Sequence, residues 1–267
     1  PAAGATPRFD AVGLSESEIG LAWDDGTFDE DRFIVERCLG SGADCDEDNE
    51  FTTEVTVKPG SVPDLLLLYR MNETLWNSTA GEVRDDSGNG RHGRSYGGAV
   101  TGSDGRYYRA GMFDGSNDYV TTPLVVDQSA TGSGVTVEGW VYPTVDSTSY
   151  KYLFSTDNGG SDWGLALYGA NWYVSNGTSA VNTGQAALFN TWQHLALSFE
   201  PGVGIKLYRN GALIWSTATL GYDSSSAAMT IGRQGNYNQY YFPGRIDDLA
   251  VYNRPLARSE EHTSELQ

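Results

Sequence analysis

Short segments in which apolar and polar residues alternate run through most of this 267-residue chain, and they limit its fold more than any other feature. Clear examples are TVEGWVYP (136–143), LALSF (195–199) and IKLYRNGALIWS (205–216). A period of two is typical of β-strands, and the Asn210–Gly211 pair inside the third segment is typical of a two-residue hairpin turn. No segment shows a convincing helical period. We therefore expect an all-β protein.

The composition agrees with many short strands joined by turns. The chain has 33 Gly, 16 Tyr and 7 Trp, while charged residues make up only 19%. From residue 64 to about 257 we count around ten candidate strands with turn residues between them. Such an arrangement predicts a two-sheet antiparallel sandwich of the jelly-roll type.

The first 60 residues differ from the rest. Their alternating segments, EIGLAW (18–23), RFIVERC (32–38) and FTTEVTV (51–57), are separated by acidic turns. The Trp23 strand end followed by FIVER resembles the first half of a fibronectin type III domain, whose later half is missing here. We predict a small, partial fibronectin-like β segment over residues 1–60 and a second domain over residues 64–257.

The two cysteines of the chain, Cys38 and Cys45, lie in CLGSGADC. This spacing suits zinc poorly and no histidine lies nearby, so we favour a disulfide that closes a hairpin tip. A disulfide would indicate an oxidising, extracytoplasmic compartment.

Five motifs follow one another over about three-quarters of the chain. They are DDSGNGRHG, AGMFDGSNDYV, TVEGWVYP, the pair WQHLALSF and LYRNGALI, and FPGRIDDLAVYNRPL. In this order they resemble a laminin G-like jelly roll of the concanavalin A-like lectin/glucanase superfamily, in its bacterial secreted form. The resemblance implies the same fold as the alternation does.

The last ten residues, RSEEHTSELQ (258–267), do not continue this pattern. They equal the translation of a common sequencing-adapter oligonucleotide in one reading frame. We therefore predict that residues 258–267 are a non-native tail, and we leave them out of the fold.

Charge and hydropathy exclude two classes of partner. The net charge of −18 would repel phosphates, so we expect no nucleic-acid partner. The longest apolar run, LLLLY (65–69), is far too short to cross a bilayer, so we expect no membrane span in this fragment.

The stretch DDSGNGRHG (85–93) could in principle be a phosphate loop, a metal-binding loop or a structural turn. It lacks the Lys and the following helix of a phosphate loop, and it lacks the alternating acids and terminal Glu of an EF-hand. We favour a structural turn of surface coil. The alternative is that Asp85, Asp86 or Asn89 donates an oxygen to a cation.

The family resemblance also implies a structural Ca²⁺ where the first long strands meet the last. Asp114 in FDG and Asp247 in GRIDD occupy matching positions, with Asp118 and Asp248 as nearby reserves. Neighbouring residues of a strand point to opposite faces, so we expect at most one of Asp247 and Asp248 to ligate by its side chain. Calcium prefers carboxylate and carbonyl oxygens, which these acids and adjacent glycines supply. The alternative is that all four are ordinary turn and surface carboxylates.

Catalysis has little support in the sequence. Glycosidases need two carboxyl groups a few ångströms apart, but Glu138 and Glu200 stand alone in their segments. His194 lies in a strand that we expect to be packed, and no acid is placed to complete a triad with Ser198. We name no catalytic residue.

Aromatic residues could stack on the apolar faces of sugar rings. The candidates come from the middle hairpin and from GNYNQYY (235–241): Trp163, Tyr168, Trp172, Tyr173, Tyr237 and Tyr240. The alternative is that they are core and surface aromatics of an ordinary sandwich.

Together these features indicate a non-enzymatic extracellular binding or adhesion module, secreted or on a cell surface. We expect its partner to be a glycan, with Ca²⁺ as a structural ion. The alternative is a spacer or protein-interaction module of a large bacterial surface protein, with an extracellular protein as partner. A glycoside hydrolase-like enzyme is the third alternative.

Overall fold

The computed structural model describes residues 64–126, 134–159, 161–221, 226–235 and 237–256, together with the backbone of four strands nearer the N-terminus. The chain divides into two compact units, residues 1–63 with 266–267, and residues 64–265. We describe each unit by itself.

The first unit contains two separate antiparallel strand pairs. β1 (Phe9–Gly13) pairs with β2 (Ile19–Trp23), and β3 (Phe33–Cys38) pairs with β4 (Phe51–Val57). The three segments expected to be strands in this part of the chain thus lie in β2, β3 and β4. The predicted Cys38–Cys45 disulfide falls outside the described residues, because the structure gives only the backbone of Cys38 and nothing of Cys45.

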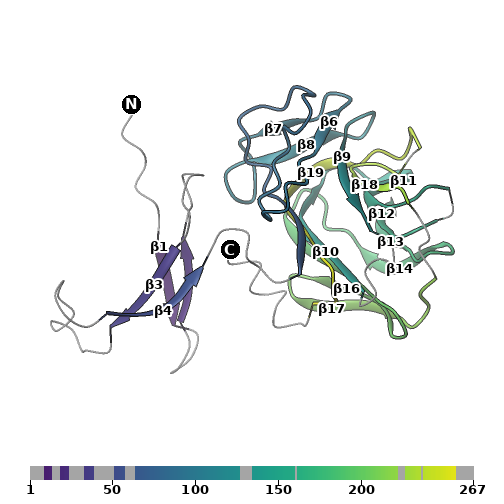
Figure 1. Ribbon diagram of the computed structural model, residues 1–267. Coiled ribbons are helices and arrows are strands. Elements are labelled where there is room, and N and C mark those ends of the chain that lie inside the picture. The colour runs from purple at the N-terminus through teal and green to yellow at the C-terminus, as the bar shows by residue number, and fades with distance from the viewer. Residues whose placement is uncertain are drawn as a thin grey trace. The chain divides into compact units, whose positions relative to one another are not determined.

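The second unit is a sandwich of two antiparallel sheets, as the sequence predicts (Figure 1). The eight-stranded sheet has the order β17 (Ala212–Thr217), β16 (Gly204–Arg209), β15 (Gln193–Glu200), β10 (Val135–Pro143), β19 (Pro243–Tyr252), β8 (Ala110–Asp114) and β7 (Val100–Gly102), with β5 (Leu65–Tyr69) also paired to β19. The seven-stranded sheet has the order β14 (Ala180–Ala186), β13 (Asn171–Ser175), β12 (Gly164–Gly169), β11 (Ser147–Ser155), β18 (Ala228–Ile231), β9 (Tyr119–Val125) and β6 (Arg94–Tyr96).

The first and last strands of the sandwich lie side by side. Leu249 of β19 is opposite Tyr69 of β5, and Gly244 of the same strand is opposite Phe113 of β8. The hairpin between β16 and β17 turns at Asn210 and Gly211, whose φ angles are 49° and 71°. Positive φ at both positions is what the Asn-Gly pair predicts for this turn.

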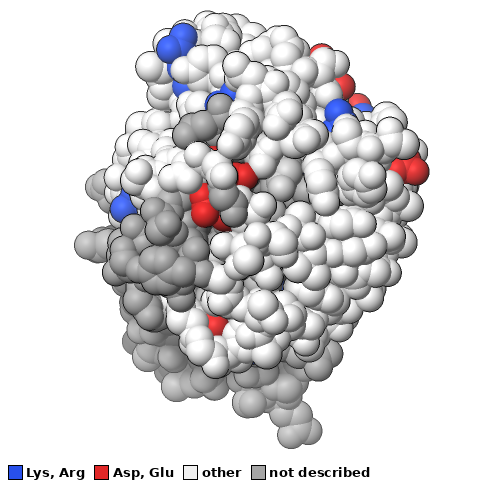
Figure 2. All heavy atoms as spheres, turned by 90° about the vertical axis from the view of Figure 1, so that its right-hand side faces the viewer, with Lys and Arg blue, Asp and Glu red and all other residues white. Residues whose placement is uncertain are grey.

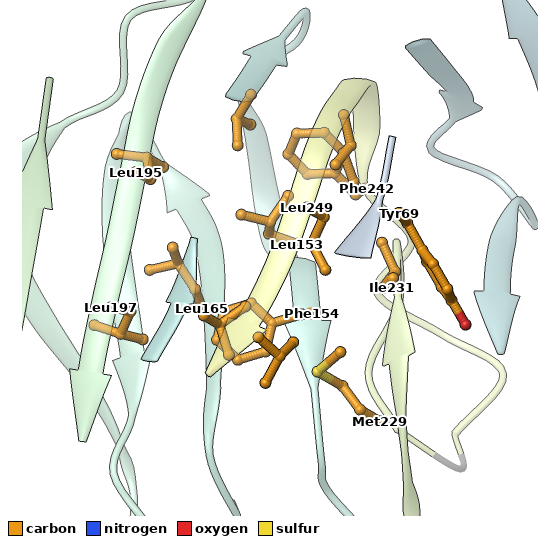
Figure 3. Packing of buried hydrophobic residues seen from close by; sticks show 14 of the residues in the cluster. Tyr69, Leu153, Phe154, Leu165, Leu195, Leu197, Met229, Ile231, Phe242 and Leu249 are labelled. Carbon is orange, nitrogen blue, oxygen red and sulfur yellow. The ribbon is translucent and has the colours of Figure 1, made fainter. Parts of the chain in front are cut away.

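The core fills the space between the sheets. Figure 3 shows leucines of the eight-stranded sheet, among them Leu195 and Leu197 of β15, meeting Leu165 of β12 and Phe154 of β11 from the other sheet. Alternate residues of each strand point into this layer, as a period of two requires. In the described part of the chain there is no helix, and hence none long and apolar enough to span a membrane.

Candidate functional site

The motif DDSGNGRHG forms a turn that is fastened to β5. The buried carboxylate of Asp85 accepts hydrogen bonds from the backbone amides of Leu68 (3.0 Å) and Arg91 (2.8 Å). Asn89 Nδ2 donates to the carbonyl of Leu65 at 2.8 Å. These side chains therefore hold a turn against the first strand, which is the structural role that we favour for the motif.

Five tyrosines gather on the outer face of the seven-stranded sheet, and we call them the tyrosine cluster. Its members come from β11, from the β12–β13 hairpin and from the loop before β19: Tyr150, Tyr152, Tyr168, Tyr173 and Tyr240. Strand register explains their common side. Tyr152 is opposite Ala166, and Ala166 is opposite Tyr173, so these side chains alternate with the inward-facing Leu165 and Leu167.

The rings are in direct contact. The ring centroid of Tyr150 is 4.9 Å from that of Tyr168, 5.5 Å from that of Tyr173 and 5.9 Å from that of Tyr240. Tyr152 lies beneath them and its hydroxyl is 3.0 Å from Ser175 Oγ. Burial raises the pKa of both Tyr150 and Tyr152, so the hydroxyls stay protonated at neutral pH.

The cluster faces solvent on one side. Tyr168 is 40% exposed, and Tyr150, Tyr173 and Tyr240 are half-buried. β11, β12 and β13 lie on the right-hand side of the sandwich in Figure 1, which Figure 2 turns toward the viewer. Figure 2 shows few charged side chains on this side. The surface therefore offers aromatic rings and hydroxyls in a setting with little charge.

The six aromatic candidates from the sequence separate into three groups. Tyr168, Tyr173 and Tyr240 belong to the tyrosine cluster, and Tyr237 is an exposed residue of the neighbouring loop. Trp163 and Trp172, at 1% and 0% exposure, lie in the core.

For Trp163 and Trp172 the expectation of a sugar-facing ring does not hold. Trp172 lies one residue before Tyr173 in β13 and so points to the opposite face. Trp163 stacks on Phe199 of the other sheet, with 4.4 Å between the ring centroids. Neither ring has a face that a ligand could reach.

Sequence reasoning missed two members of the cluster, Tyr150 and Tyr152. Their spacing in YKY carried the signal, since residues two apart in a strand share a face. It also missed a second group of rings on the same sheet. Tyr96 of β6 stacks on Tyr119 of β9 at 4.9 Å and 7°, and Tyr119 lies 6.2 Å from Tyr241.

Two of the four candidate calcium ligands lie at the end of β8 (Asp114) and in the turn that follows it (Asp118). Asp114 accepts hydrogen bonds from the amides of Ser116 (2.7 Å) and Asn117 (3.3 Å), and the buried Asp118 accepts one from the amide of Asp114 (2.9 Å). These carboxylates shape the turn. They also line a cleft of about 450 Å³ together with Arg245, Thr144, Met112 and other residues.

The other two candidates, Asp247 and Asp248, lie in the middle of β19. Asp247 is fully buried, and its Oδ2 accepts from the amides of Arg106 (2.8 Å) and Tyr107 (3.0 Å). The Oδ1 atoms of Asp247 and Asp248 are both buried without a hydrogen-bond partner. Burial raises the pKa of both carboxyls. A fully buried acid beside a half-buried one, each with a buried oxygen that has no hydrogen-bond partner, is costly unless a proton or a cation neutralises the pair.

The register separates the two pairs of acids. Asp114 is opposite Pro243, which precedes Asp247 by four residues in β19. That spacing corresponds to about 13 Å along a strand. Within the described ranges, no three His, Cys, Asp or Glu side chains are grouped so that they could hold a metal ion. A cation at Asp247 and Asp248 would therefore need backbone carbonyls or water as further ligands.

The residues considered for catalysis are all in strands of the eight-stranded sheet. Glu138, His194 and Ser198 are buried, on β10 and β15. Trp140 packs edge-on against His194 at 5.4 Å, which agrees with a packed histidine.

Comparison with solved structures supports the fold. Domain 4 of AbnA, a GH43 extracellular arabinanase from Geobacillus stearothermophilus solved with arabinotriose, superposes with a TM-score of 0.57 at 20% identity, over 76% of this chain and 98% of that one. The binding domain of Paraclostridial Mosquitocidal Protein 1 gives 0.55 at 20% identity, over 74% and 51%. The receptor-binding domain of a botulinum neurotoxin C/D mosaic serotype gives 0.58 at 17% identity, over 76% and 51%. This chain thus matches about half the length of the toxin binding domains.

Among curated proteins, none matches the sequence significantly. The family comparison is informative, because residues 114–260, more than half of the chain, match the profile described as the concanavalin A-like lectin/glucanases superfamily. That match covers strands of both sheets, from the end of β8 to β19. The chain therefore belongs to the concanavalin A-like lectin/glucanases superfamily.

Proposed function

We propose that this chain is a non-enzymatic extracellular carbohydrate-binding module and that the tyrosine cluster is its ligand surface. The observation that carries the proposal is the cluster itself, in which four half-buried or exposed rings meet on one face of the sandwich. Sugars present apolar C–H faces that stack on such rings, and they present hydroxyls that hydrogen-bond to phenol groups.

The chemistry of the cluster favours binding over hydrolysis. Cleavage of a glycosidic bond needs two carboxyl groups that face each other across the scissile bond. The cluster consists of tyrosines, and Figure 2 shows little charge on its side of the molecule. The arabinanase domain with the same fold was solved with arabinotriose, which agrees with sugar binding on this scaffold.

Tyr168 gives the sharpest test because it is 40% exposed and its removal leaves the core intact. We expect the unaltered protein to bind members of a glycan array, and Tyr168→Ala to weaken that binding about ten-fold, equivalent to about 1.4 kcal/mol. Leu213→Ala is the control, since Leu213 is 51% exposed on β17 of the other sheet. Unchanged binding by Tyr168→Ala would remove the cluster from the proposal. An array without any bound glycan would favour the spacer or protein-interaction function.

We also propose that a structural Ca²⁺ binds at Asp247 and Asp248. Their buried Oδ1 atoms have no hydrogen-bond partner, and carboxylate oxygens are the ligands that Ca²⁺ prefers. β19 is irregular at this point, because its register with β10 shifts between Glu138 and Trp140 and Asp248 has a φ of 46°, so strict alternation does not hold for the two neighbouring acids. The ion would neutralise both acids at the place where β19 meets β5 and the loop of Arg106. Asp114 and Asp118 do not support this site, because their oxygens bind backbone amides of their own turn.

Thermal unfolding with Ca²⁺ and with excess chelator tests this ion. We expect Ca²⁺ to raise Tm in the unaltered protein, because an ion that binds only the folded state stabilises it. Asp247→Asn should abolish the shift, whereas Asp114→Asn should keep it. The absence of a shift in the unaltered protein, or its loss in Asp114→Asn alone, would contradict the assignment.

A further inference from the structure

The outer face of the seven-stranded sheet continues from the tyrosine cluster to a second group of rings that carries positive charge. Tyr96 and Tyr119 form a directly opposed, stacked pair on β6 and β9. The guanidinium of Arg94 lies over Tyr96 at 4.9 Å, and that of Arg233 lies over Tyr119 at 3.6 Å. Each ring of the pair therefore has a cation against it. We call these four side chains the Arg–Tyr stack.

The Arg–Tyr stack adjoins the tyrosine cluster. Tyr119 is 6.2 Å from Tyr241, ring to ring, and Tyr241 forms a parallel bridge with Tyr152 of the cluster. A backbone hydrogen bond of 2.9 Å from Tyr152 to Tyr240 fixes the same contact. A glycan that lies on the cluster would therefore reach the stack with its next units.

Arg233 lacks the partner that a buried cation needs. It is 8% exposed, its Nε has no hydrogen-bond partner, and its Nη1 donates to Asn238 Oδ1 at 2.7 Å. Among the described residues, four basic side chains form ion pairs with carboxylates: Arg70, Lys206, Arg245 and Arg254. Neither Arg233 nor Arg94 takes part in any of these pairs. The chain has a net charge of −18, so an unpaired buried guanidinium is unexpected.

The ring contact compensates Arg233 only in part. A cation over an aromatic face gains less free energy than a buried charge without a counter-charge loses on leaving water. Asp118, the residue before Tyr119, accepts a hydrogen bond from the amide of Asp114, and no ion pair of the described residues joins it to Arg233. An external anion would therefore supply the counter-charge that Arg233 lacks.

We propose that the Arg–Tyr stack binds the carboxylate of an acidic sugar unit, with Arg233 as the residue that recognises the charge. This inference rests on the proposed function, because it extends the ligand surface of the tyrosine cluster and names its substrate class. The guanidinium presents planar donors that match a carboxylate, and such charge-assisted hydrogen bonds are stronger than neutral ones. Neutral units would stack on the cluster, and an acidic unit would lie at Arg233.

Matched glycans provide the test. The probes are acidic oligosaccharides that contain uronic or sialic acid and the same oligosaccharides with each carboxylate reduced to an alcohol. Affinities are measured for the whole chain at low and at moderate salt. We expect the acidic member of a pair to bind about ten-fold more tightly, and this preference to shrink as salt rises.

Variants assign the preference to Arg233. Arg233→Gln should lower the affinity for the acidic member to that for the reduced member, and should leave the reduced member unchanged. Arg233→Lys should keep part of the preference, because it retains the charge without the planar fork. Arg209→Gln, a base on β16 that donates to the carbonyl of Ala186, is the control. Thermal unfolding of each variant verifies that it is folded.

The outcomes separate the two proposals. Equal binding of acidic and reduced glycans would overturn the inference and leave carbohydrate binding standing. A preference that persists in Arg233→Gln would overturn the role of Arg233. Binding to neither member of any pair would overturn the proposed function and the inference with it.

Discussion

The two faces of the β12–β13 hairpin use similar side chains for different purposes. On the inner face Trp172 and Val174 are completely buried against the other sheet. On the outer face the rings of Tyr168 and Tyr173 are in contact, with 5.5 Å between their centroids, and both are accessible to solvent. Trp172 and Tyr173 are consecutive, so a shift of one residue changes an aromatic ring from packing to surface. The pleat of the strand, rather than the aromatic content, decides which rings can meet a ligand.

The largest effect should come from the inner face. Trp172→Ala removes a fully buried ring and leaves a cavity between the sheets, so we expect the free energy of unfolding to fall by about 3–5 kcal/mol. Urea denaturation followed by far-UV circular dichroism measures this loss. A decrease below about 1 kcal/mol would mean that the ring is not part of the core.

A smaller effect on stability should come from the neighbouring residue. Tyr173→Ala removes a half-buried ring of the cluster, and we expect a loss of about 1 kcal/mol because aromatic pairs contribute about that much. Its effect on glycan affinity should be the larger one, about ten-fold, which is about 1.4 kcal/mol. Titration calorimetry beside urea denaturation separates the two. If Tyr173→Ala lost more stability than Trp172→Ala, the assignment of the faces would be reversed.

The smallest effect concerns pH. Burial raises the pKa of Tyr152 in the folded protein, whereas in the unfolded chain this tyrosine ionises at about pH 10. The folded protein therefore keeps the phenol proton of Tyr152 to a higher pH than the unfolded chain does. The stability from this group is complete below about pH 10 and is lost as pH rises toward the folded pKa. Tyr152→Phe should therefore flatten the fall in Tm above pH 10. An unaltered slope would show that other tyrosines cause it.

Much of the fold follows from the sequence because each strand alternates strongly. The β16–β17 hairpin is an example, since IKLYRNGALIWS contains both the alternation and the turn that joins the strands. Three strands of the sandwich escaped this reasoning, β6, β7 and β14, and so did β1 in the first unit. β6 and β7 have three residues each, and β14 reads AVNTGQA, which lacks a strong pattern. These strands form because a neighbouring strand offers hydrogen bonds along its edge.

The candidate site was less accessible to sequence reasoning. Tyr240 comes from a loop about 90 residues after Tyr150, and only the pairing of that loop with β11 brings the two rings together. The unsatisfied oxygens of Asp247 and Asp248 depend in the same way on the packing around β19. Sequence reasoning grouped the tyrosines of the hairpin with Trp163 and Trp172, because the sequence alone did not show which face of the sheet each ring would occupy.

The pairing of β5 with β19 has a mechanical consequence. Leu65 at the start of β5 is opposite Tyr252 at the end of β19, and the amide of Asn253 donates to the carbonyl of Asp64 at 2.9 Å. Both ends of the sandwich therefore emerge at the same end of the paired strands β5 and β19. Tension applied through the flanking chain would load these hydrogen bonds one after another, so β5 would separate from β19 at a low force. A sandwich whose chain ends lay at opposite ends of the paired strands would instead have to break all these hydrogen bonds at once.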